Sequence, residues 1–227
     1  MDRASLARTM DQTLLKPTVG LADARTWMEA SAGQGFASLC VSPFLVPLAA
    51  EVLAGTGTLV CSVCGFPLGY ATTPSKAAEA GLLVDAGCDE VDMVINIAEL
   101  LAGDDDYVRE DVAAVVRAAA DHSGGAAIVK VILETGYLDA DQIVRACRLC
   151  VEAGAQFVKT STGFGPRGAS VDDVRIMRAE VGPDVGVKAA GGIRDLDVAL
   201  GMLEAGASRL GTSSGIEILE AFDVRGG

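Results

Sequence analysis

Several residue types are scarce in this 227-residue sequence, and each scarcity argues against a class of function. Histidine and tryptophan each occur once, and aromatic residues make up only 4% of the chain. Lys and Arg total 18 against 31 Asp and Glu, so the formal net charge is −13. Because phosphate contacts need clusters of basic side chains, this deficit argues against nucleic acid as a partner.

Long apolar segments are also missing, although half of the residues are hydrophobic. No apolar run approaches the roughly 20 residues that a membrane-spanning helix needs. The opening segment, MDRASLARTM, lacks the apolar region of a signal peptide. We therefore expect a protein that does not bind membranes and is cytoplasmic. Its length allows a single domain over residues 1–227 with a large buried core.

Six cysteines include two C-x-x-C pairs, which raise the alternative of a zinc site. Cys61 and Cys64 lie in a predicted strand, where positions i and i+3 point to opposite faces. Cys147 and Cys150 lie in a predicted helix whose apolar face would bury them. We therefore favour free, buried thiols. The only histidine, His122, lies at a predicted helix end, in a turn, and completes neither a metal site nor a catalytic triad. No metal or other cofactor is expected.

The sequence instead contains a regular alternation of apolar strands and helices. The predicted strands cover residues 10–15, 36–42, 58–64, 90–96, 126–133, 156–161, 185–189 and 208–212. The predicted helices cover residues 21–33, 43–54, 74–85, 107–121, 139–153, 170–181, 196–205 and 215–222. Strands this apolar are typical of a parallel sheet. Eight strand–helix units favour a closed (β/α)8 TIM barrel, and a doubly wound open sheet is the alternative.

Four charged residues interrupt these otherwise apolar strands. Asp92, Lys130, Lys159 and Lys188 lie on the fourth, fifth, sixth and seventh predicted strands, which are neighbours in a barrel. A single lysine could face outward and extend between helices. Four charges on adjacent strands favour a shared interior site instead, because buried charges are costly unless they are paired. In such barrels catalytic groups come from the C-terminal ends of the strands, so we predict an active site here.

Lysine chemistry is the reaction type that this set of residues supports. A neutral lysine amine attacks a carbonyl to form a Schiff base, which is an electron sink for breaking or making an adjacent carbon–carbon bond. Burial and a second nearby ammonium both lower the pKa of a lysine and free its amine near neutral pH. The set therefore predicts covalent catalysis by a lysine.

Glycine-rich segments follow the last three predicted strands, at residues 163–168, 191–194 and 211–215. Each precedes a predicted helix, so its backbone N–H groups can face a bound anion. The first segment also matches G-x-G-x-x-G, but Pro166 and the position after the sixth strand favour a small phosphate over a dinucleotide. The candidate phosphate ligands lie in or next to these segments: Thr160, Gly163, Gly191, Gly192, Arg194, Gly211, Ser213 and Ser214.

Eight motifs extend over nearly the whole chain: DQTLLKP (11–17), CVSP (40–43), VCGFPLG (63–69), EVDMVIN (90–96), KVILETG (130–136), FVKTSTGFG (157–165), VKAAGGIR (187–194) and RLGTSSG (209–215). Together they resemble deoxyribose-phosphate aldolases of the DeoC type, which are class I aldolases. The resemblance implies reversible cleavage of 2-deoxy-D-ribose 5-phosphate to D-glyceraldehyde 3-phosphate and acetaldehyde, without a metal, in deoxyribose catabolism.

The resemblance also implies roles for the four charged residues. Lys159 would be the Schiff-base lysine, and Lys188 would lower its pKa and help to move protons. Asp92 would donate and accept protons, and Lys130 would line the site without a catalytic role. The expected partners are the phosphorylated sugar, acetaldehyde and a second copy of the chain in a homodimer.

Three positions depart from the family pattern. Gln12 replaces a histidine that is usual in the first motif, and Pro166 and Arg167 stand where small residues are common. The chain also ends in AFDVRGG, without the C-terminal tyrosine of some relatives. Two alternatives remain open, namely a Schiff-base aldolase for another phosphorylated sugar and a phosphate-binding barrel without catalysis.

Overall fold

Eight parallel strands form the centre of the structure, which is a computed structural model describing residues 1–226. The strands are β1 (Met10–Leu14), β2 (Ser38–Val41), β3 (Leu59–Cys64), β4 (Glu90–Val94), β5 (Ile128–Ile132), β6 (Phe157–Lys159), β7 (Gly186–Ala190) and β8 (Arg209–Thr212). Neighbours pair in chain order, and β1 also pairs with β8 through Met10 and Leu210. The sheet is therefore a closed barrel, which confirms the predicted fold and excludes the open sheet.

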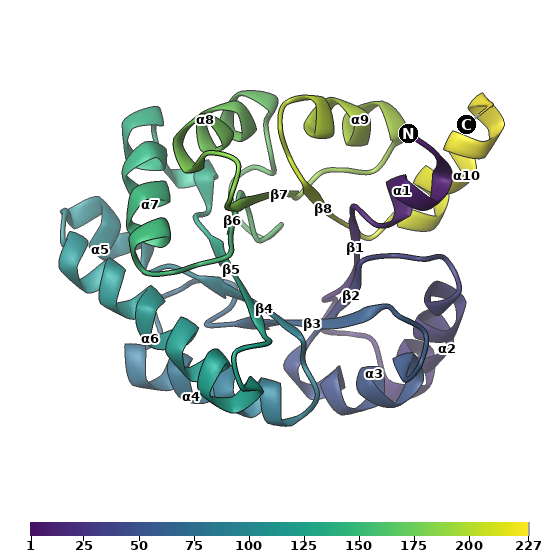
Figure 1. The fold of residues 1–227 in the computed structure, drawn as a ribbon, viewed down its shortest axis with the longest axis horizontal. Coiled ribbons are helices and arrows are strands. Elements are labelled where there is room, and N and C mark those ends of the chain that lie inside the picture. The colour runs from purple at the N-terminus through teal and green to yellow at the C-terminus, as the bar shows by residue number, and fades with distance from the viewer. Residues whose placement is uncertain (227) are drawn as a thin grey trace.

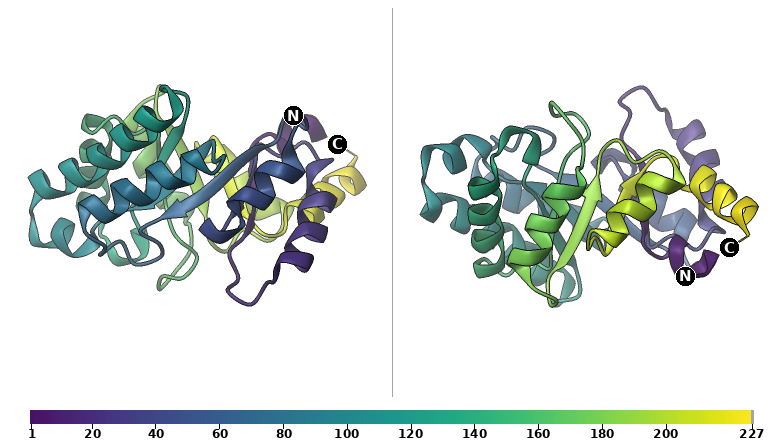
Figure 2. Two further views of the ribbon diagram at one scale, coloured as in Figure 1. Left: turned by 90° about the horizontal axis from the view of Figure 1, so that it is seen from below. Right: turned by 90° about the horizontal axis from the view of Figure 1, so that it is seen from above.

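Helices surround the ring of strands, as Figure 1 and the two side views of Figure 2 show. They are α1 (Arg3–Ala7), α2 (Leu21–Ala32), α3 (Val46–Leu53), α4 (Thr73–Asp85), α5 (Ile97–Ala102), α6 (Asp105–Ser123), α7 (Ala140–Glu152), α8 (Val171–Val181), α9 (Leu196–Glu204) and α10 (Gly215–Arg225), with the short 3-10 turns η1 (Pro43–Leu45) and η2 (Thr135–Tyr137). None of the helices in the described part of the chain has both the length and the apolar character of a membrane span.

Two short helices, α1 and α5, are not among the predicted elements. The side chain of Asp2 caps α1 by accepting a hydrogen bond from the Ser5 amide, and that of Asn96 caps α5 by accepting one from the Glu99 amide. Such N-caps stabilise helices that are too short to show a clear apolar period. Helix α1 lies beside α10, so the two ends of the chain are close together (Figure 1).

Strand alternation separates two interior regions of the molecule. Outward-facing residues such as Val91 and Val131 join the main apolar core, which lies between the barrel and its helices. A small second cluster inside the barrel contains Cys40, Cys61 and Val63. The rest of the barrel interior is mostly polar, and this is where the charged residues of β4 to β7 lie.

All six cysteines are free and buried, as the sequence predicts. Cys61 belongs to the cluster inside the barrel and Cys64 to the outer core, so the two face opposite sides of β3. Burial raises the pKa of the Cys147 thiol to about 12. His122, which was predicted at a helix end, lies in the last turn of α6, where its Nδ1 is 2.8 Å from Oδ1 of Asp85.

Candidate active site

The strand register brings the four predicted charged residues together inside the barrel. Asp92 pairs with Lys130 across β4 and β5, and Lys159 pairs with Lys188 across β6 and β7. Ile132 is the β5 partner of Lys159, so Lys159 stands two residues nearer the C-terminal end of the barrel than Lys130 does. The side chains of all four are buried.

Asp92 is the residue on which the three lysines converge. Its Oδ2 lies 2.7 Å from Nζ of Lys159 and 2.7 Å from Nζ of Lys188, and its Oδ1 lies 2.8 Å from Nζ of Lys130. The thiol of Cys61 also donates to Oδ1 at 3.3 Å. Burial by itself would raise the pKa of Asp92, but the charges of Lys130, Lys159 and Lys188 hold it well below its ordinary value.

A second layer of charge lies below Asp92, toward the N-terminal end of the barrel. Lys188 Nζ is 2.5 Å from Oδ2 of Asp11, and Lys130 Nζ is 2.7 Å from Oε2 of Glu90. Arg209 joins both carboxylates, at 2.5 Å from Asp11 and 3.2 Å from Glu90. Asp11, Glu90 and Arg209 are not among the predicted site residues, although each also interrupts an apolar strand. All three lie near strand starts, where polar residues are common in any barrel.

The two deeper lysines are held in the charged form. Burial would lower the pKa of Lys188, but Asp11 and Asp92 raise it above its ordinary value. Burial acts in the same way on Lys130, and Asp92, Asp11 and Glu90 are among the groups that raise its pKa. Both side chains are fully buried, so neither amine can reach a substrate.

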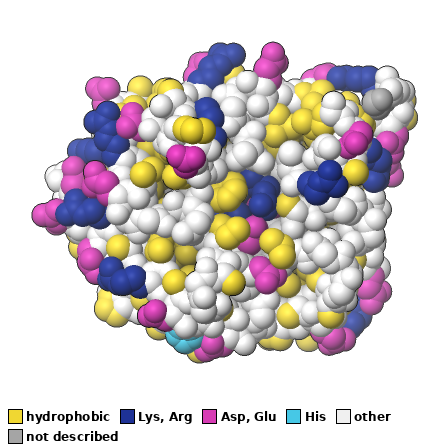
Figure 3. All heavy atoms as spheres, viewed as in Figure 1, with side chains coloured by type: hydrophobic (Ala, Val, Ile, Leu, Met, Phe, Trp, Pro, Cys, Tyr) yellow, Lys and Arg dark blue, Asp and Glu magenta, His cyan; other side chains and the backbone are white. Residues whose placement is uncertain are grey.

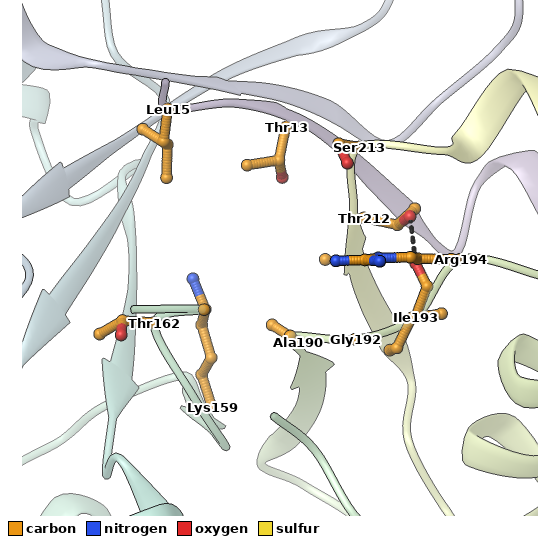
Figure 4. Close-up of a pocket in the computed structure, with 13 residues that line it drawn as sticks. Thr13, Leu15, Lys159, Thr162, Ala190, Gly192, Ile193, Arg194, Thr212 and Ser213 are labelled. Atoms are coloured by element: carbon orange, nitrogen blue, oxygen red, sulfur yellow. Dashed lines mark hydrogen bonds between the residues drawn. The ribbon is translucent and has the colours of Figure 1, made fainter. Parts of the chain in front are cut away.

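Of the three lysines that contact Asp92, Lys159 is the one with access to solvent. Its side chain is 5% exposed and lines a cavity of about 170 Å3 at the C-terminal end of the barrel. In Figure 4 its amine points into this cavity, with Thr13 and Leu15 on the opposite wall. The hydroxyl of Thr212 donates to the Ile193 carbonyl at 2.6 Å, which joins the loop after β7 to the end of β8.

Six of the eight predicted phosphate ligands line the same cavity: Gly163, Gly191, Gly192, Arg194, Gly211 and Ser213. Thr162 also lines it and was not predicted. Gly211 has a further reason to be glycine, because a Cβ there would lie 3.1 Å from Cε of Lys188 and 2.9 Å from Cβ of Ala190.

The other two predicted ligands, Thr160 and Ser214, do not line this cavity, and their part in phosphate binding stays a prediction. Strand alternation turns Thr160 away from the side to which Lys159 points, and its hydroxyl instead donates to the Ala190 carbonyl and accepts from the Ala190 amide, both at 3.1 Å. The amide of Ser214 donates to Oγ1 of Thr212, and its side chain borders a neighbouring cavity.

Two interior groups combine residue types that bind metals, namely Cys40, Cys61 and Asp92, and Asp11, Cys61 and Glu90. Lysine ammonium groups already lie within 3 Å of all three carboxylates. Because bound cations would compete with these ammonium groups at close range, the arrangement suits lysines and does not suit a metal ion.

Comparisons with known proteins agree with this geometry. Residues 4–221 match the description "DeoC/LacD family aldolase". The chain belongs to this aldolase family. It is 50% identical to a deoxyribose-phosphate aldolase of Bacillus subtilis, over 98% of each chain, and 50% identical to one of Thermococcus kodakarensis, over 97% of this chain and 98% of that one. The resemblance to DeoC-type aldolases is therefore confirmed.

Solved structures support the assignment of the chain to the DeoC/LacD aldolase family. A protein described as "QR15, an Aldolase" superposes with a TM-score of 0.91 at 39% identity, covering 97% of each chain. A deoxyribose phosphate aldolase from Aeropyrum pernix, described as tetrameric, superposes with a TM-score of 0.89 at 33% identity, over 98% of this chain and 92% of that one.

The departures from the family pattern have defined places in this DeoC/LacD aldolase. The side-chain oxygen of Gln12 accepts a hydrogen bond from the Gly215 amide at 2.9 Å, so it joins β1 to the start of α10. Arg167 pairs with Asp173 and donates to the Thr135 carbonyl at 2.9 Å. Arg167 therefore fastens the loop after β6 to its surroundings and does not line the cavity.

Glu134 fastens the same loop from the other side. It has a left-handed backbone (φ 54°), is 1% exposed, and accepts hydrogen bonds from the amide and the hydroxyl of Thr162. A Cβ on Gly165 would lie 2.7 Å from its carboxyl carbon, so a larger residue there would have to displace the Glu134 carboxylate. Through Thr162, Glu134 fixes the wall of the cavity next to Lys159.

Proposed function

We propose that this chain is a deoxyribose-phosphate aldolase that cleaves 2-deoxy-D-ribose 5-phosphate through a Schiff base on Lys159. One observation carries the choice of nucleophile: of the three lysines around Asp92, Lys159 lines the cavity, whereas Lys130 and Lys188 are fully buried. The family membership and the names of the relatives support the substrate.

The reaction starts at C1 of the open-chain sugar. The neutral amine of Lys159 adds to this aldehyde carbon, and uptake of one proton with loss of one water gives the protonated Schiff base. The C2–C3 bond then breaks, its electron pair moves toward the iminium, and the C3 hydroxyl loses its proton as glyceraldehyde 3-phosphate leaves. The remaining enamine takes up a proton at C2, and one water hydrolyses the new Schiff base to release acetaldehyde and free Lys159.

Asp92 and Lys188 handle the protons in this proposal. Asp92 is buried beneath Lys159 and does not line the cavity, so a water would carry the C3 hydroxyl proton to it. Lys188 shares Oδ2 of Asp92 with Lys159 and remains charged, which favours the unprotonated form of a neighbouring amine. Lys130 neutralises the other oxygen of Asp92 and has no direct part in catalysis.

The loops after β7 and β8 supply the phosphate site. Gly191 and Gly192 have left-handed backbones, and with Ser213 they line the cavity on the side where Arg194 extends into it (Figure 4). Arg194 is exposed at this rim, and a guanidinium can bind phosphate through two parallel hydrogen bonds. The distance from Lys159 to this rim is bridged by the carbon chain of the sugar.

Borohydride trapping with acetaldehyde tests the proposal directly. Reduction of the Schiff base converts Lys159 to N-ethyl-lysine, which peptide mapping locates. Lys16 provides an internal control, because it is exposed and borders the neighbouring cavity but not that of Lys159. We expect rapid modification of Lys159 and loss of it in a Lys159→Ala variant. An unmodified Lys159 peptide, or full aldolase activity in Lys159→Ala, would contradict the proposal.

Donor scope separates this function from that of a Schiff-base aldolase for another sugar. A deoxyribose-phosphate aldolase uses acetaldehyde as the donor and glyceraldehyde 3-phosphate as the acceptor in the synthetic direction. Failure to form deoxyribose 5-phosphate, with Lys159 still trapped by another carbonyl donor, would favour the alternative. The homodimer and the cytoplasmic location stay predictions; light scattering on the purified protein tests the first.

A further inference from the structure

Arg209 lies at the opposite end of the barrel from the cavity, beneath the two layers of charge. Its guanidinium contacts Asp11 and both oxygens of Glu90, and its Cζ lies 5.5 Å from the centre of the Phe157 ring. The side chain is 13% exposed and borders a recess shared with Arg8. Figure 3 shows basic side chains near the centre of one face of the molecule, with hydrophobic and acidic side chains around them.

The interior charges form one connected group of seven side chains. Arg209 pairs with Asp11 and Glu90. Asp11 pairs with Lys188, and Glu90 pairs with Lys130. Both of these lysines pair with Asp92, which also pairs with Lys159. The group contains four basic and three acidic side chains, so it carries one excess positive charge when every group is ionised. It is neutral when Lys159 has lost its proton.

We infer that Arg209 is a positioning residue that sets the pH range in which the Lys159 amine is free to react, acting through Asp11 and Glu90. This inference rests on the proposed role of Lys159. Without Arg209, three lysines would face three carboxylates, and every ammonium would be balanced. Lys159 would then keep its proton to higher pH. Arg209 supplies the fourth positive charge, so the connected group carries one excess positive charge whenever Lys159 is protonated.

The groups that face Lys159 come from most strands of the barrel. Asp92 on β4 and Lys188 on β7 are the nearest charges, and Lys130 on β5 shares Asp92. The other titratable or charged groups around the interior and the cavity are Asp11 on β1, Cys40 on β2, Cys61 on β3, Glu90 on β4, Arg209 on β8 and Arg194 after β7. Of these groups, Asp11 and Glu90 contact Arg209 directly, so a change at Arg209 would act on Lys159 through them.

Charge-balanced variants test this inference on the full-length enzyme. The readout is the pH at which the initial rate of borohydride trapping of Lys159 by acetaldehyde is half maximal. Arg209→Gln is expected to move this midpoint upward, because it removes one positive charge from the connected group. Glu90→Gln removes a negative charge and is expected to move it downward. The double variant R209Q/E90Q has three basic and two acidic groups, restores the single excess charge, and is expected to return the midpoint toward that of the wild type.

Arg209→Lys separates charge from shape, because it keeps the charge and loses the planar guanidinium. It is expected to leave the midpoint near the wild-type value. A purely structural role would lower the amount of folded protein in R209Q but leave the midpoint in place, and that result overturns the inference. If R209Q does not fold, an unchanged or raised midpoint in E90Q overturns it. Absence of N-ethyl-Lys159 in the wild type would instead refute the proposed function.

Discussion

Lys159 and Lys188 lie opposite each other in the register of β6 and β7, and their Nζ atoms are each 2.7 Å from the same oxygen, Oδ2 of Asp92. Two ammonium groups that share one acceptor oxygen cannot both be fully satisfied, because each reduces the benefit of the other's pairing. Lys188 has a second carboxylate, Asp11, and Lys159 does not. Lys159 is therefore the less strongly paired of the two lysines, and it is the one that lines the cavity.

Replacing Asp92 with Asn should abolish most of the activity. The amide keeps the shape but removes the charge that joins three lysines, and it is a poor proton acceptor. We expect kcat for deoxyribose 5-phosphate cleavage to fall by about 100-fold or more. Asp111→Asn is the matched control, because Asp111 also pairs with a buried lysine but lies outside the barrel interior. It should lose stability while its folded fraction keeps a normal kcat. Full kcat in Asp92→Asn would contradict the role of Asp92.

The two arginines near the phosphate loops should behave differently. Arg194 lines the cavity, whereas Arg167 is held by Asp173 and the Thr135 carbonyl. We expect Arg194→Ala to raise KM for deoxyribose 5-phosphate by about 10-fold or more, because a charge-assisted contact to phosphate is worth about 1.5–3 kcal/mol. Arg167→Ala should change KM much less and lower the thermal midpoint instead. The reverse order of the two KM values would show that the loop after β6 binds the phosphate.

Sequence patterns predict the barrel and the centre of its site for clear physical reasons. A charge in an apolar strand is conspicuous, which is why Asp92, Lys130, Lys159 and Lys188 could be identified together. The same alternation places Thr160 on the opposite face from Lys159, since adjacent strand residues point to opposite faces. Asp11, Glu90 and Arg209 could not be singled out in this way, because polar residues near strand ends are common in any barrel.

The buried ion pair outside the barrel interior could not be predicted from the sequence. Lys76 lies on α4, where a lysine normally faces water, yet it is fully buried. Its partner Asp111 on α6 is equally buried and 35 positions away. Helix periodicity tolerates one polar residue on an apolar face, and only the packing of α4 against α6 reveals that the two form a pair.

The folded protein should lose stability as the pH falls. Buried lysines hold the pKa values of Asp11 and Asp92 below their ordinary values, although burial alone would raise them. In the unfolded chain an aspartate takes up its proton at about pH 3.9. In the folded protein Asp11 and Asp92 take up theirs only at lower pH. The stabilisation is therefore complete above about pH 5 and is lost progressively as the pH falls toward the folded pKa values. Urea unfolding at a series of pH values measures this loss, and a midpoint that rises on acidification would contradict it.

The pair formed by Lys76 and Asp111 should contribute to stability and not to catalysis. Lys76 Nζ lies 2.7 Å from Oδ2 of Asp111 and 2.8 Å from the Val94 carbonyl at the end of β4, and Thr73 donates to Oδ1 of Asp111 at 2.8 Å. Lys76→Met removes the cation and leaves a buried carboxylate with a single hydroxyl partner. We expect a loss of about 3–5 kcal/mol in the free energy of unfolding, measured with urea.

A double variant separates the two sources of that loss. In Lys76→Met with Asp111→Leu both charges are replaced by apolar groups, so no carboxylate is stranded in the core. Buried ion pairs replaced in this way are often neutral in stability or even gain it, so the double variant should be more stable than Lys76→Met alone. If the two variants are equally unstable, the cost arises from lost contacts of the Lys76 side chain. Gly65 points to such contacts, since a Cβ there would lie 2.9 Å from Cε of Lys76. A kcat per folded molecule equal to that of the wild type in the double variant would place the pair outside the catalytic site.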